Sequence, residues 1–165
     1  MIVVSDSSPL IALARIGRLN VLASLFQRIR IPTEVHHEVT VAGRGLPGAE
    51  EVRRAPWIEV GVPRGPAEQS LERACEGLGA GERGAIVLAK SLTADLTLLD
   101  ESRARRIAQK AGLSVVGCLG VLETGARQGH VPDLRAAYMD LLRQGIRFDL
   151  KLLQDSLTRL GLPKL

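Results

Sequence analysis

Apolar and polar residues follow one another along this chain in two patterns. Short apolar runs, typical of buried strands, separate stretches in which apolar residues recur every three or four positions, as on one face of a helix. The runs predict strands at 2–5, 28–31, 57–62, 96–99 and 114–117. The periodic stretches predict helices at 10–14, 19–26, 33–39, 49–54, 67–76, 82–92, 102–111, 119–128, 133–144 and 149–160. Because the two kinds alternate, we expect an α/β fold: a parallel sheet flanked by helices, with extra C-terminal helices.

Length and the placement of Gly and Pro predict one domain. The chain has 165 residues, 45% of them hydrophobic, which is enough for a sizeable core. Gly and Pro concentrate between residues 42 and 66, and we interpret this segment as a surface excursion because neither side of it could fold alone. We therefore predict a single domain over 1–165, with an α/β core over 1–128 and a helical extension over 129–165.

Two acids stand where predicted strands end. Asp6 follows the first strand, and two serines and a proline come next, as in the first turn of a helix. Asp100 follows the fourth strand and also precedes a predicted helix. The carboxyl ends of parallel strands meet at one edge of the sheet, where open α/β sheets bind ligands. We therefore expect Asp6 and Asp100 to share that edge.

Two glutamates are expected at the same edge. Glu38 lies on the helix after the second strand, and Glu82 opens a helix directly after the glycine-rich segment 77–81. Mg²⁺ and Mn²⁺ prefer oxygen ligands, and two such ions on a phosphodiester can activate water and stabilise the leaving oxygen. The four acids predict a divalent-metal site in which Asp6 and Asp100 hold the principal ion and Glu38 and Glu82 complete the cluster.

Neighbouring acids compete for these roles. Glu34 shares a helix face with Glu38, and Glu101 adjoins Asp100 as a further ligand. Asp95 precedes its strand, so we expect it at the opposite edge of the sheet. Each site acid also has a purely structural interpretation, because strand-end acids can cap helices and a first-turn glutamate stabilises a helix N-terminus.

The chain is basic, with 22 Lys and Arg against 18 Asp and Glu and a net charge of +4. A basic protein with an acidic site fits a polyanionic substrate handled through metal ions, although +4 is also an ordinary charge. The helix after Asp100 carries Arg103, Arg106 and Lys110, which predict either contacts to a phosphate backbone or a solvated basic face. Aromatic residues make up 2% of the chain, so stacking on bases is poorly supplied.

Cysteine usage and hydropathy predict the compartment. Cys75 and Cys118 are far apart, which indicates a reducing, cytoplasmic setting with both as small core residues. No signal segment precedes the first strand, and no apolar run approaches the roughly 20 residues of a membrane span. We expect a cytoplasmic protein without membrane contact.

The C-terminal helices carry more leucine than a small sheet needs. These residues are Leu141, Leu142, Leu150, Leu152, Leu153, Leu157 and Leu160. The excess predicts a homodimer.

Five segments in this order resemble the PIN domain family, and most of all an uncharacterised prokaryotic PIN-like subgroup related to VapC toxin ribonucleases. They are residues 3–11 (VVSDSSPLI), 31–39 (IPTEVHHEV), 79–86 (GAGERGAI), 98–101 (LLDE) and 116–122 (VGCLGVL). The resemblance extends over nearly the whole chain. It implies a three-layer fold with a parallel sheet of four to five strands.

The resemblance also implies Mg²⁺- or Mn²⁺-dependent cleavage of RNA, with Asp6, Glu38, Glu82 and Asp100 as the acids. It implies the toxin of a type II toxin–antitoxin pair, with RNA as substrate and an antitoxin protein as partner. Members often carry a hydroxyl residue just before the last acidic motif, where this chain has two leucines, Leu98 and Leu99. Ser7 or Ser8 matches the hydroxyl near the first acid, and Glu101 is the second acid of the last motif.

Two other functions are consistent with the residues. The absent hydroxyl near Asp100 fits a PIN-like module that binds RNA or protein with little nuclease activity. A receiver-like phosphotransfer domain also uses strand-end acids and Mg²⁺, but Cys118 stands where such a domain needs a late lysine.

Overall fold

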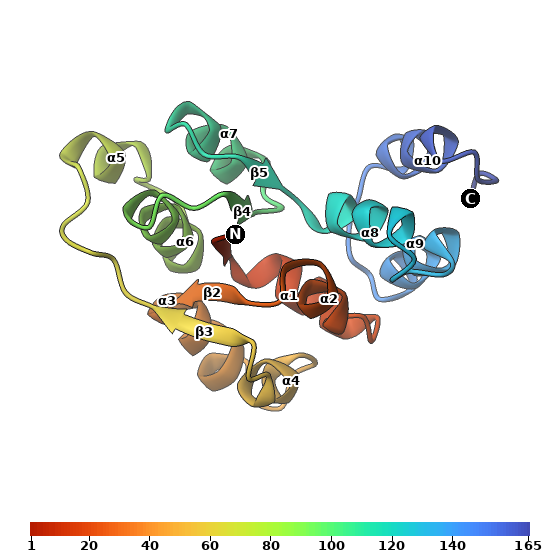
Figure 1. Ribbon diagram of the computed structural model, residues 1–165, viewed down its shortest axis with the longest axis horizontal. Coiled ribbons are helices and arrows are strands. Elements are labelled where there is room, and N and C mark those ends of the chain that lie inside the picture. The colour runs from red at the N-terminus through yellow and green to blue at the C-terminus, as the bar shows by residue number, and fades with distance from the viewer.

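Five parallel strands form one sheet at the centre of the computed structural model, which describes residues 1–165 (Figure 1). They are β1 (Val3–Ser5), β2 (Ile29–Pro32), β3 (Ile58–Gly61), β4 (Leu96–Leu98) and β5 (Val115–Val116). The order across the sheet is β3-β2-β1-β4-β5, and every neighbouring pair is parallel. The α/β class and the parallel sheet predicted from the sequence are confirmed.

Helices connect the strands and continue beyond the last one. They are α1 (Ser7–Arg15), α2 (Asn20–Phe26), α3 (Thr33–His36), the π-helix η1 (His37–Ala42), α4 (Ala49–Arg54), α5 (Gln69–Ala74), α6 (Ala80–Ser91), α7 (Ser102–Lys110), α8 (Cys118–Arg127), α9 (Leu134–Arg143) and α10 (Leu150–Arg159). The helix predicted over 33–39 runs on to Ala42 because it widens into the π-helix η1. Hydrophobic periodicity does not report such a widening, which is common at functional sites.

The sheet separates two hydrophobic clusters. Side chains of adjacent strand residues point to opposite faces, so Val3 packs with α1, α2 and α8 while Val4 packs with α6 and α7. Leu98 and Leu99 divide between the two clusters in the same way. Helices therefore cover both faces, which gives the three layers that Figure 1 shows.

The C-terminal helices pack onto α8 and extend the first cluster. Leu134, Leu141, Leu153 and Leu157 are fully buried there or nearly so. Of the seven leucines that predicted a homodimer, Leu141, Leu153 and Leu157 are buried here, and Leu142 and Leu160 pack partly buried against the same cluster. Leu150 and Leu152 on α10 stay exposed.

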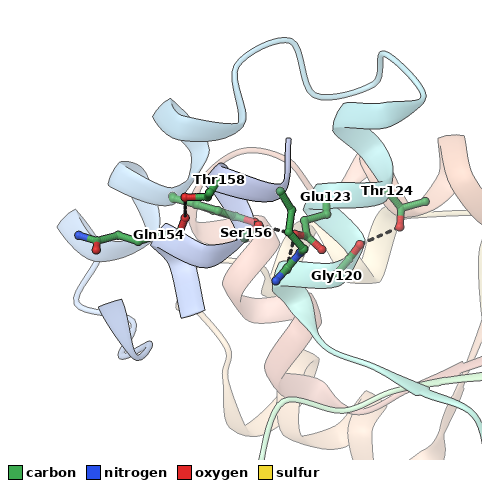
Figure 2. Close-up of polar contacts among 8 residues, drawn as sticks. Gly120, Glu123, Thr124, Gln154, Ser156 and Thr158 are labelled. Carbon is green, nitrogen blue, oxygen red and sulfur yellow. Dashed lines mark hydrogen bonds and ion pairs between the residues drawn. The ribbon is translucent and has the colours of Figure 1, made fainter. Parts of the chain in front are cut away.

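A polar network joins α8, α9 and α10. Figure 2 shows its link between Glu123 on α8 and Ser156 on α10. Ser156 donates its hydroxyl hydrogen to Glu123, so Tyr138 donates to Ser156, with 2.5 Å between the oxygens in each pair. Arg159 donates to the same Glu123 oxygen at 2.7 Å. Burial raises the pKa of Tyr138 to about 12, which keeps its hydroxyl protonated as a donor.

No helix combines the length and the apolar character that crossing a membrane requires. Cys75 and Cys118 are both buried and form no disulfide, as expected of small core residues.

Candidate active site

Asp6 lies where β1 ends and α1 begins. Its backbone amide donates to the Leu98 carbonyl at 3.0 Å, which continues the pairing of β1 with β4 by one residue. The residue is 2% exposed, and although it occupies the N-cap position of α1, its carboxylate makes no capping hydrogen bond. The structure therefore gives Asp6 a buried place at the carboxyl edge of the sheet that helix capping does not explain.

The Ser7 hydroxyl connects Asp6 to Glu38. Its Oγ lies 2.7 Å from Glu38 Oε2 and 3.2 Å from Asp6 Oδ1. The other Glu38 oxygen accepts the backbone N–H of Gly81 at 2.9 Å. A Cβ at position 81 would collide with the Glu38 carboxylate, so glycine permits the close approach of η1 to α6. The structure thus brings the first strand end, η1 and the start of α6 together.

Glu82 has a structural role at the same place. Its Oε2 accepts the N–H of Gly79 at 3.1 Å, which satisfies a backbone donor at the start of α6 and explains why the helix begins before Glu82. Its charge also acts on Asp6, whose pKa it raises. Glu82 therefore has both predicted roles. It stabilises the helix start, and it belongs to a group of acids with Asp6 and Glu38, which we call the acid cluster.

Asp6 is the most perturbed carboxyl group of the site. Its pKa rises to about 6, chiefly because the group is buried, and further because Glu82 and Glu38 are negatively charged. The amide and hydroxyl of Ser7 oppose that rise. A carboxylate that is buried beside two others without a cation is typical of functional sites.

Asp100 stands at the same sheet edge but has different partners. Its Oδ1 accepts the N–H of Cys118 at 2.7 Å, at the start of α8. Burial raises its pKa, and the Cys118 amide and the Arg105 guanidinium lower it. No hydrogen bond joins Asp100 to Asp6, Glu38 or Glu82. The structure thus groups Asp6, Glu38 and Glu82, whereas Asp100 follows the neighbouring strand β4 and has partners of its own.

Arg105 contacts the site, although the sequence predicted phosphate contacts only for Arg103, Arg106 and Lys110 on the same helix. It is half-buried, and it donates to the Leu99 carbonyl at 2.9 Å. Its Nη1 and the Asp100 Oδ1 each lie 2.8 Å from the point that a Cβ of residue 117 would occupy, so Gly117 makes room for both. Buried Ala104 and Ala108 mark the inner face of α7, and this pattern could have separated Arg105 from its exposed neighbours.

The secondary residues divide between the site and helix ends. Ser7 reaches the carboxylates, whereas Ser8 is exposed. Glu101 is the N-cap of α7 and accepts the Ala104 N–H at 2.7 Å. Asp95 accepts the N–H of Ile2 at the amino end of the sheet, on the edge expected for it. Arg103, Arg106 and Lys110 are exposed on α7.

The acids fit a hard divalent cation by their chemistry. No Lys or Arg forms an ion pair with Asp6, Glu38 or Glu82. No three acidic, histidine or cysteine side chains are placed to hold a metal between them. Mg²⁺, however, is usually bound by one or two carboxylates, with waters and substrate phosphate completing its shell. Asp6 and Glu38, joined by Ser7 and lacking a counter-charge, are such a pair.

Comparison with known protein families identifies the family of this chain. A family model described as PIN domain matches residues 2–162. No curated protein and no solved structure matches the chain. PIN domains are usually nucleases, and PIN nucleases generally use divalent metal ions. Because the match spans almost the whole chain and includes all four acids, this chain belongs to the PIN domain family.

Proposed function

We propose that this chain is a metal-dependent ribonuclease that hydrolyses RNA phosphodiester bonds at the carboxyl edge of its sheet. The observation that carries the proposal is the burial of Asp6 beside Glu38 and Glu82 without a cation. Ionising such a carboxylate is unfavourable in the protein alone, and a divalent cation bound there offsets that cost.

Asp6 would hold Mg²⁺ or Mn²⁺ with Glu38, to which Ser7 joins it, in place of the Asp6–Asp100 pair that the sequence predicted for the principal ion. Such an ion would supply an activated water and neutralise charge on the phosphodiester. The Ser7 hydroxyl holds the Glu38 carboxylate against Asp6. Glu82 adds negative charge beside Asp6, while its hydrogen bond to Gly79 keeps it at the start of α6. One oxygen of Asp100 is committed to the Cys118 amide, and its second oxygen accepts no hydrogen bond, so it is free to serve the same site.

A toxin role accompanies the nuclease proposal. RNA as the substrate, an antitoxin protein as the partner and a cytoplasmic setting follow from the resemblance to VapC-like toxins. The net charge of +4 supports a polyanionic substrate. Co-purification of the chain with the product of a neighbouring gene, and relief of growth arrest by that product, would support the toxin role. An unchanged growth rate on expression of the active chain alone would contradict it.

We also propose a homodimer. The exposed apolar surface available for its interface is smaller than the seven C-terminal leucines of the sequence predicted. Exposed Leu150 and Leu152 on α10 are the leucines left for it. Sedimentation at micromolar concentration should show a dimer that Leu152→Lys dissociates, and a monomeric wild-type chain would overturn this assignment.

Cleavage of a mixed RNA pool tests the nuclease. The wild-type chain should cleave with Mn²⁺ and not with EDTA, and Asp6→Asn should lower the rate at least about 100-fold, since even outer-shell partners of metal ligands contribute 10–100-fold. Asp155→Asn is a matched control, because Asp155 is exposed on α10 and accepts no hydrogen bond. Full cleavage by Asp6→Asn would show that the site is wrongly assigned.

One observation favours a binding module with little activity as the second candidate. Glu82 and Glu101 both accept backbone hydrogen bonds at helix starts, so two predicted ligands already have structural roles. Such a module would bind RNA or a protein equally in Mn²⁺ and in EDTA and would not cleave. Turnover of RNA together with Mn²⁺ binding would exclude it.

A further inference from the structure

Four basic side chains line one cavity. Its lining comes from the segment that contains α5, α6 and α7, the helices on one face of the sheet (Figure 1). Lys90 comes from the last turn of α6, and Arg103, Arg106 and Lys110 come from α7. The cavity has a volume of about 720 Å³, and Glu68 is the one acid in its lining. The four positive charges therefore gather around a space large enough for a ligand.

None of these four side chains forms an ion pair, although the charges of Arg103 and Arg106 act on Glu101 at the start of α7 and lower its pKa. The arginines that do form ion pairs are Arg28, Arg30, Arg53, Arg54, Arg83, Arg143 and Arg159. Two of the four are instead held by backbone carbonyls: Arg103 donates to Glu76 and Lys90 to Ala111, each at 2.7 Å. These contacts fix the position of the charge and leave it available to an anion.

None of the four predicted acids lines the cavity, but one of its lining residues, Arg103, lies three positions after Asp100. Arg103 lies on the first turn of α7, close after Asp100, and contacts the loop that leads into α6 and Glu82. Lys110 is the last residue of α7, roughly 10 Å further along the helix at 1.5 Å per residue. A strand leaving the cluster along α7 would pass each cation in turn.

We propose that this cavity is a track for the phosphate backbone of the RNA strand on one side of the cleavage point, an inference that rests on the ribonuclease function proposed above. The lining contains no aromatic residue, and its apolar part is formed by small or aliphatic side chains such as Leu71 and Ile107. The track therefore contacts the phosphates of the RNA and stacks on no base, so its binding should not depend on the base sequence. An acidic protein segment is the competing occupant, and the start of α7 directly after Asp100, with Arg103 in its first turn, favours RNA.

The salt dependence of RNA binding tests the track. Anisotropy of a labelled, mixed-sequence single-stranded RNA would be measured in EDTA, so that no cleavage occurs. Each phosphate contact contributes about −0.7 to the slope of log K against log salt for a single strand. Arg106→Gln with Lys110→Gln, neither of which makes an intramolecular hydrogen bond, should reduce the magnitude of the slope by about 1.4. Arg127→Gln with Lys151→Gln removes the same charge from α8 and α10 and should leave the slope unchanged.

The outcomes separate the track from the nuclease. If both double variants changed the salt slope equally, net charge alone would explain the effect and the track would be overturned. A wild-type chain that binds no RNA would overturn it as well. Binding of poly-glutamate that depends on Arg106 and Lys110, without RNA binding, would assign the cavity to a protein partner instead. RNA binding with the expected slopes, but no cleavage in Mn²⁺, would leave the track standing while the nuclease proposal fails.

Discussion

The acid cluster and the C-terminal network both bury polar side chains, but they balance them differently. In the network, Glu123 accepts from Ser156 and from the positively charged Arg159. In the cluster, Asp6 meets Glu38 and Glu82, all of the same charge, with hydroxyl and amide donors only. A polar group that is fully partnered contributes to stability, whereas crowded like charges reduce it. The contrast separates Asp6, Glu38 and Glu82, whose charges lack a counter-charge, from the buried polar side chains of the network, which are partnered.

The largest expected effect follows from the pKa of Asp6. Its rise from 3.8 to about 6 means that the native state keeps a proton that the unfolded chain releases. Between these values the stability of the cation-free protein falls as pH rises, and above about pH 6 the loss is complete at about 3 kcal/mol. In EDTA at pH 7, Asp6→Asn should therefore raise the free energy of unfolding by up to that amount. The gain should vanish near pH 4.

Urea unfolding of both chains at the two pH values measures this difference. Adding Mn²⁺ should stabilise the wild-type chain at pH 7 and leave Asp6→Asn nearly unchanged, because the variant lacks a ligand. A less stable Asp6→Asn at pH 7 would show that the cluster is compensated after all, and the contrast with the network would disappear.

Removing Glu123 should have the opposite sign. Glu123→Ala leaves Ser156 and Arg159 without their shared acceptor, and hydrogen bonds to charged groups contribute about 2 kcal/mol. Glu123→Gln keeps an acceptor for Ser156 while removing the charge, so its smaller loss separates the two contributions. Both losses can be read from urea unfolding at pH 7, and stabilisation by either substitution would place the network in the same class as the acid cluster.

Local pattern and tertiary contact explain what the sequence could and could not reveal. Asp6 and Asp100 could be found because a strand end followed by a helix start is a local signal. The bridge from Ser7 to Glu38 joins residues 31 positions apart and depends on the π-helical turns of η1. Arg105 was passed over because its contacts with Leu99 and Gly117 arise only when α7 packs beside β5. The sequence did not reveal the partners of Asp100 either, because the Cys118 amide and Arg105 come close to it only in the folded chain.

The close approach at Gly81 offers a way to disturb the cluster without changing its charge. In Gly81→Ala the new Cβ collides with the Glu38 carboxylate and moves it away from Ser7. We expect Mn²⁺ affinity, measured by calorimetry, to fall roughly tenfold, as for other residues that orient metal ligands. Alanine favours a helix by up to about 1 kcal/mol over glycine, so the unfolding free energy should change little. An unaltered Mn²⁺ affinity would remove Glu38 from the proposed ligands.

The smallest effect concerns a buried hydroxyl that belongs to neither region. Thr97 on β4 is fully buried, and its Oγ1 has no hydrogen-bond partner. Burying an unpartnered hydroxyl costs about 1 kcal/mol or more, so Thr97→Val should stabilise the chain by about 1 kcal/mol. Thr40 is the matched control, since its buried hydroxyl donates to the His36 carbonyl at 2.7 Å and Thr40→Val should give no gain. Equal shifts in the unfolding midpoints of Thr97→Val and Thr40→Val would mean that partnered and unpartnered hydroxyls contribute equally to stability in this core. The contrast between the acid cluster and the network would then lose its physical basis.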